Sequence, residues 1–118
     1  MTQAHAIEHG YADVNGVRLH YARAGEGPLM LFLHGFPEFW RGWKKPLEHF
    51  GARGWCAVAP DMRGYNLSDK PAEVEAYRAK HLGADVLALA AHYGKDPFVL
   101  VAHDWGGLHY YIRIYLWV

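Results

Sequence analysis

The sequence lacks the features that mark secreted, membrane-spanning or nucleic-acid-binding proteins. Cys56 is its single cysteine, which excludes a disulfide framework. Twelve lysines and arginines balance twelve aspartates and glutamates, so no net charge attracts nucleic acid or an anionic membrane. No basic and apolar leader opens the chain, and no apolar run approaches the roughly 20 residues of a membrane span. We therefore expect a cytoplasmic protein without nucleic-acid or membrane partners.

The chain has enough apolar material for one small domain. Of its 118 residues, 52% are hydrophobic and 15% aromatic, and it contains neither repeats nor low-complexity segments. Domains of about 100–150 residues are the commonest size. Cys56 lies in the apolar run 55–59 and is expected to be a buried core thiol.

Five segments have the pattern of β-strands. Segments 11–14 and 17–24 flank Asn15-Gly16, which predicts a hairpin with a two-residue turn. The continuous apolar runs 29–33, 55–59 and 98–101 are typical of strands buried on both faces.

Two segments between the strands have helical spacing. The first carries Trp40, Trp43, Leu47 and Phe50; Pro46 is expected to start its regular helix, and Gly51 and Gly54 to end it. The second carries a stripe of Leu82, Val86, Leu89 and Tyr93, and Gly94 caps it. Alternating strands and helices after a hairpin predict an α/β fold, with a mostly parallel sheet flanked by helices. Ligands bind such sheets at the carboxyl ends of the strands.

The strongest motif at a strand end is His103-Asp104-Trp105-Gly106-Gly107, which has the pattern of a nucleophile elbow. Small residues at 102 and 106 permit a sharp strand-to-helix turn, and the following helix N-terminus favours the negative charge of Asp104. A carboxylate so placed can attack an electrophilic carbon and form an ester. The alternative interpretation is that Asp104 is only a helix N-cap.

Two further motifs end predicted strands. In His34-Gly35-Phe36-Pro37, the backbone N–H of Phe36 is a candidate oxyanion donor, and the N–H of Trp105 would be the second. Taken alone, 34–37 also fits an ordinary Gly-Pro loop. Segment 61–69 is expected to shape the loop beside the site, with Arg63 paired to Asp61 or Asp69 and Asn66 in a left-handed turn conformation.

Together the segments 34–40, 61–71 and 103–107 resemble the epoxide hydrolases of the α/β-hydrolase superfamily, over roughly residues 8–107. The resemblance implies an α/β-hydrolase fold and a small-molecule epoxide substrate, with no cofactor and no metal. It implies that Asp104 is the nucleophile and that Phe36 and Trp105 supply the oxyanion-hole amides. It also implies a substrate pocket lined by His34, Pro37 and Trp105.

The resemblance implies groups that are absent after Asp104. Family members have eight strands, and an acidic residue and a histidine base follow the nucleophile. In this sequence we expect about five strands. No acidic residue follows Asp104, and the only later histidine is His109. We therefore expect residues 1–107 to be the N-terminal part of the hydrolase core and the chain to be incomplete and inactive alone. A dehalogenase fragment and a non-catalytic binding or dimerising module are the alternatives.

Residues 108–118 form an atypical tail. Their aromatic and β-branched residues favour a strand, whereas the family pattern favours a helix after the elbow. A frameshifted or readthrough end and a divergent helix in a truncated chain both fit. We expect the strand 98–101 to be an exposed edge that promotes self-association, with the tail covering part of it.

Overall fold

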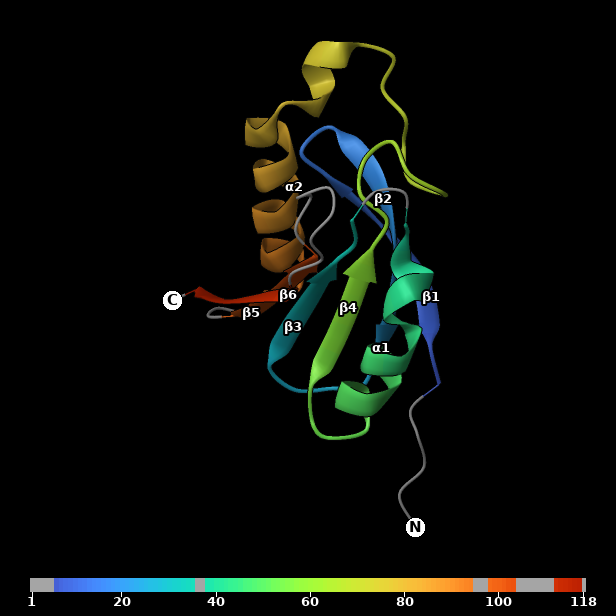
Figure 1. The fold of residues 1–118 in the computed structure, drawn as a ribbon, viewed down its shortest axis with the longest axis vertical. Coiled ribbons are helices and arrows are strands. Elements are labelled where there is room, and N and C mark those ends of the chain that lie inside the picture. The colour runs from blue at the N-terminus through green and yellow to red at the C-terminus, as the bar shows by residue number, and fades with distance from the viewer. Residues whose placement is uncertain (1–5, 36–37, 95–97, 104–111, 118) are drawn as a thin grey trace.

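The computed structural model describes residues 6–35, 38–94, 98–103 and 112–117. Its centre is one six-stranded sheet in the order β1-β2-β4-β3-β5-β6 (Figure 1). The strands are β1 (Glu8–Val14), β2 (Val17–Ala24), β3 (Leu29–Leu33), β4 (Cys56–Pro60), β5 (Phe98–His103) and β6 (Ile112–Trp117). The helices are α1 (Lys44–Gly51) and α2 (Ala79–His92), each preceded by a short 3-10 helix, η1 (Trp40–Trp43) and η2 (Val74–Tyr77).

The predicted hairpin is confirmed. Strands β1 and β2 pair antiparallel, with Val14 opposite Val17 across the turn. Asn15 and Gly16 have φ angles of 50° and 77°, the left-handed values that a two-residue hairpin turn requires. Strand β2 has the expected bounds, and β1 begins three residues earlier than expected, at Glu8.

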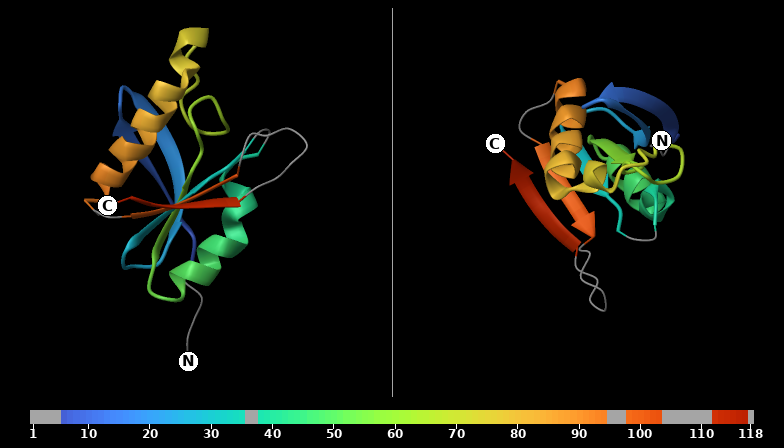
Figure 2. Two further views of the ribbon diagram at one scale, coloured as in Figure 1. Left: turned by 60° about the vertical axis from the view of Figure 1, so that its left-hand side comes forward. Right: turned by 90° about the horizontal axis from the view of Figure 1, so that it is seen from above.

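The three central strands are parallel, as the alternating pattern predicts, while the sheet as a whole is mixed. Strand β3 pairs parallel with β4 on one side and with β5 on the other, whereas β2 and β6 run antiparallel to their neighbours. From β3 the chain crosses to β4 on one side, and from β4 it crosses back past β3 to β5 on the other side. Right-handed crossovers in opposite directions place α1 and α2 on opposite faces of the sheet (Figure 2).

Each face of the sheet has its own apolar core, because successive side chains of a buried strand point to opposite sides. On β4, Val58 packs in the cluster that includes Leu89 of α2, and Ala57 packs in the cluster that includes Leu47 of α1. Cys56 is 1% exposed, which confirms the expected buried thiol.

Both expected helices are present. Helix α1 ends at Gly51 as expected, but it begins at Lys44, so Pro46 is the third residue of its first turn. Helix α2 ends at His92, and Gly94 follows with a φ of 62°. No helix among the described residues is long and apolar enough to cross a membrane.

The expectation that β5 is an exposed edge is wrong over its whole length. Residues Ile112–Trp117 form β6, which pairs antiparallel with β5 from Phe98 opposite Trp117 to His103 opposite Ile112 (Figure 2). The expected covering of this edge by the tail is therefore confirmed and is complete. Over 112–117, the β preference of the aromatic and branched residues prevails over the helix that the family pattern favours.

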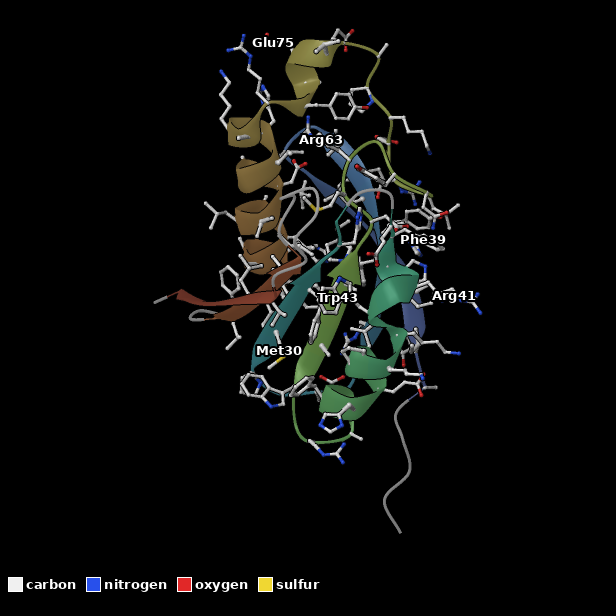
Figure 3. The ribbon with its side chains drawn as sticks, in the orientation of Figure 1. Met30, Phe39, Arg41, Trp43, Arg63 and Glu75 are labelled. Carbon is white, nitrogen blue, oxygen red and sulfur yellow. The ribbon has the colours of Figure 1, made fainter. Side chains whose placement is uncertain are left out.

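A buried ion pair ties the loop after β4 to α2. Arg63 donates from Nε and Nη2 to the two carboxylate oxygens of Asp85, at 2.6 and 2.7 Å, and the side chains are 5% and 3% exposed. Its Nη1 donates to the carbonyl of Ala76, and Asn15 of the hairpin donates to Asp85. Figure 3 shows Arg63 of this loop next to the start of α2. The hydrogen bond to Asp85 raises the pKa of Arg63, so the guanidinium stays charged.

Replacing Asp85 with asparagine should destabilise the fold strongly, because it leaves the buried Arg63 charge uncompensated. Removing one partner of a buried pair costs about 3–5 kcal/mol. The free energy of unfolding in urea measures the loss. The matched control is Glu75→Gln, which breaks the exposed Arg78–Glu75 pair and should cost about 0–1 kcal/mol. Equal losses in the two variants would contradict the assigned role of Arg63–Asp85.

Candidate active site

The carboxyl ends of the three parallel strands meet at one edge of the sheet. Val58 of β4 lies opposite Leu31, and Ala102 of β5 lies opposite Leu33. His34 follows β3 directly and Asp61 follows β4 directly. The motifs that begin at these two residues therefore lie at one sheet edge, as predicted, and their strands are neighbours.

Most of the predicted catalytic groups lie outside the described residues. These are Asp104, the amides of Phe36 and Trp105, and the pocket residues Pro37 and Trp105. Their predicted roles stay predictions. The structure does describe the strands that lead into both segments, and it describes His34.

Asp61 is the most heavily hydrogen-bonded side chain at this edge. It is fully buried, and one carboxylate oxygen accepts from the Trp40 backbone N–H at 2.9 Å. The other oxygen lies 2.6 Å from Nδ1 of His20 and accepts from the Asn66 amide at 2.9 Å. The carboxylate therefore joins η1, β2 and the loop after β4.

The ring of His34 joins the loops after β3 and β4. Its Nε2 accepts the backbone N–H of Met62 at 3.0 Å, so the ring proton is on Nδ1, which lies 3.1 Å from the carbonyl oxygen of Gly35. The ring is 2% exposed and packs edge-on against Tyr65, with ring centroids 4.6 Å apart. Burial raises the pKa of Tyr65, so its phenol stays neutral beside His34. These contacts show how His34 orders the site edge, and its place in a substrate pocket stays a prediction.

The loop 61–69 shapes the edge as expected, but with a different partner for its arginine. Arg63 pairs with Asp85 and not with Asp61 or Asp69, because Asp61 already has donors from three segments and Asp69 accepts the backbone N–H of Arg18. Asn66 has a φ of 43°, which confirms its left-handed turn conformation.

Two apolar cavities open beside this edge and run along α2. One has a volume of about 330 Å³ and is lined by Leu33, Met62, Leu82, Gly83, Val86, Leu87, Phe98 and Leu100. The other has a volume of about 430 Å³ and is lined by Met62, Arg63, Tyr65, Tyr77, Ala79 and Leu82. Met62 and Leu82 border both. Small-molecule sites have volumes of roughly 300–1,000 Å³ and mostly apolar linings, and both cavities fall in that range.

Sequence reasoning missed two residues at this edge, although each gives a signal. His20 occupies the β2 face that otherwise carries Ala22 and Ala24, and Asp85 occurs within the apolar stripe of α2. A polar side chain on a buried face needs a partner, and the partners prove to be Asp61 and Arg63. No group of three or more potential ligands among the described residues could hold a metal ion.

Comparisons with known proteins agree with this architecture. The family described as "alpha/beta hydrolase fold" matches residues 28–110. An AB hydrolase superfamily protein of Bacillus subtilis is 44% identical over 99 residues, which cover 82% of this chain and 35% of that protein. Epoxide hydrolase 1 of Caenorhabditis elegans is 48% identical over 100 residues, covering 83% and 24%.

Solved structures of epoxide hydrolases are similar to most of this chain. An enzyme from Vigna radiata has a TM-score of 0.82 at 46% identity and covers 86% of this chain and 32% of its own. Epoxide hydrolase A from Mycobacterium thermoresistibile has a TM-score of 0.82 at 36% identity, covering 87% and 33%. The chain thus spans about a quarter to a third of the length of the relatives named here. It belongs to the α/β-hydrolase fold family, and its similarity to the epoxide hydrolases named here covers 83–87% of its length.

Proposed function

We propose that this chain carries the nucleophilic half of an epoxide hydrolase-type site, with Asp104 as the attacking carboxylate. The observation that supports it is the register of β3 and β5. Leu33 and Ala102 are opposite each other on parallel strands. Phe36 and Asp104 follow those two residues by three and two positions, so both segments start from adjacent points on the edge where α/β folds bind ligands.

The proposed step is ring opening by the carboxylate. A carboxylate oxygen of Asp104 attacks one epoxide carbon, the carbon–oxygen bond of the ring breaks, and the freed oxygen takes a proton from water. The product is a hydroxyalkyl ester on the protein. Water then attacks the ester carbonyl, and the amides of Phe36 and Trp105 stabilise the oxyanion of that second half. The proposal makes His34, Pro37 and Trp105 the lining of the substrate pocket.

The second half should be slow in this polypeptide. A positioned general base contributes about 10²–10⁴-fold, and within these 118 residues no aspartate or glutamate follows Asp104 to orient one. A dehalogenase-type reaction uses the same nucleophile and is the alternative. Location in the cytoplasm, expected from the sequence, stays a prediction.

Incubation with a reactive epoxide such as styrene oxide should therefore add one epoxide mass to the chain and give little free diol. Intact-mass measurement and peptide mapping place the adduct, and we expect it on Asp104. Asp104→Asn should abolish the adduct. Asp13→Asn, which changes an exposed aspartate of β1, should leave it intact.

Three results would count against this proposal. An adduct that persists in Asp104→Asn would exclude the nucleophile, and sustained diol release would show that the chain needs no further base. Halide release from a haloalkane, without an epoxide adduct, would favour the dehalogenase alternative.

We also propose that the chain self-associates through the edge of its sheet. Strand β6 lies at one end of the described sheet and β1 lies at the other. Strand β6 is the more apolar edge, because Arg113 is its only charged residue, whereas β1 carries Glu8 and Asp13. An apolar edge strand is a template for pairing with a second copy.

Analytical ultracentrifugation should then show a concentration-dependent dimer. Ile114→Lys introduces a charge into β6, which opposes edge pairing, and should shift the equilibrium to monomer. Tyr11→Lys places the same charge in β1 at the opposite edge and should not. A monomer at every concentration, or equal effects of the two lysines, would contradict pairing through β6.

A further inference from the structure

We propose that Asp61, His20 and His9 form a proton relay that makes Nε2 of His9 a nucleophile toward activated acyl donors. The relay lies on β1, β2 and the end of β4, and the ring opening proposed for Asp104 does not use it. His9 is exposed, whereas His20 is 1% and Asp61 0% exposed. The three side chains thus run from the interior of the protein to its surface.

The two imidazole rings meet edge to edge. Nδ1 of His9 lies 3.0 Å from Nε2 of His20, while the ring centroids are 5.1 Å apart and the ring planes differ by 13°. Rings stacked face to face would bring their centroids about as close as their nitrogens. The larger centroid separation therefore means that the nitrogens face each other nearly in the common plane of the rings, the geometry of an N–H···N hydrogen bond.

The carboxylate fixes where each proton resides. A carboxylate only accepts, so Nδ1 of His20, 2.6 Å from Asp61, carries a proton. With His20 neutral, its Nε2 has a lone pair and accepts the proton on Nδ1 of His9. The remaining nitrogen of His9, Nε2, then carries a lone pair, because the bond made by one ring nitrogen sets the state of the other. Among the described residues, none is hydrogen-bonded to this Nε2.

This arrangement suits nucleophilic catalysis. When Nε2 of His9 attacks an acyl carbon, its ring becomes positively charged, and the leaving group departs with the bonding electron pair. The proton on Nδ1 of His9 then passes to Nε2 of His20, so the positive charge moves next to the Asp61 carboxylate. Water attacks the acyl-imidazole and loses one of its protons to the solvent, the carboxylic acid leaves, and His20 returns its proton to Nδ1 of His9. The sum is hydrolysis of the acyl donor by one water molecule.

The surroundings of His9 favour an acyl donor with an aromatic leaving group. Trp40 contacts the His9 ring edge-on, with centroids 4.9 Å apart, and the Tyr11 ring lies 5.4 Å from that of His20. Trp40 also donates its backbone N–H to Asp61, so one residue both holds the carboxylate and borders the nucleophile. Aromatic side chains beside the reacting nitrogen provide apolar and edge-to-face contacts for an aryl leaving group.

The first test compares histidines within the native chain. Diethyl pyrocarbonate acylates histidine and leaves a stable product, and peptide mass mapping measures the rate at each site. His9 should react at least about tenfold faster than exposed His92, since a positioned proton acceptor typically contributes 10²–10⁴-fold. Equal rates at His9 and His92 would overturn the proposal, and this comparison needs no variant.

The second test separates the relay from simple exposure. Hydrolysis of p-nitrophenyl acetate, followed by nitrophenolate release, should fall by about tenfold in His9→Gln and stay unchanged in His92→Gln. In His20→Gln, with folding verified by circular dichroism, acylation of His9 should drop to the rate of His92. An unchanged rate of His9 acylation in a folded His20→Gln variant would refute the relay. If that variant does not fold, the comparison of His9 with His92 in the native chain decides whether the relay exists.

Discussion

The edge of the sheet that carries the predicted site depends on one buried carboxylate, that of Asp61. A buried charge is costly unless the protein supplies the hydrogen bonds that water would have made. The donors for Asp61 come from η1, from β2 and from the loop that follows β4. Because η1 and β2 are far from Asp61 in the sequence, satisfying this single side chain ties together the chain after β3, the middle of β2 and the loop after β4.

The Arg63–Asp85 pair extends this constraint to the second layer of the fold. Arg63 follows Asp61 by two residues, so the start of the loop is held both by the contacts of Asp61 and by the ion pair with α2. A loop conformation that released either contact would leave a charge buried without its partner. Polar contacts therefore specify the position of the loop and of α2, while the apolar clusters on the two faces supply most of the burial.

Local patterns were sufficient for much of this fold and insufficient for its polar network. The Asn15-Gly16 turn with β2 beside it and the apolar run of β3 determine their structure over a few residues, and the predicted bounds of both strands agree with the structure. The partner of Arg63 lies 22 residues away on another element, and periodicity does not encode such a pairing. For β6, the local β preference was the better guide than the resemblance, because over 112–117 the chain pairs with β5.

Two aspartates follow apolar strands in the sequence, Asp61 after β4 and Asp104 after β5, and the structure describes the first of them. Both oxygens of Asp61 accept hydrogen bonds in a fully buried position, so its lone pairs are engaged and no substrate carbon could reach them. A nucleophile needs a free lone pair and open space in front of it. Only Asp104 precedes the small residues that permit a sharp turn away from the sheet, as the elbow pattern requires. The burial of Asp61 therefore supports Asp104 as the nucleophile, and it assigns to Asp61 the task of orienting other groups.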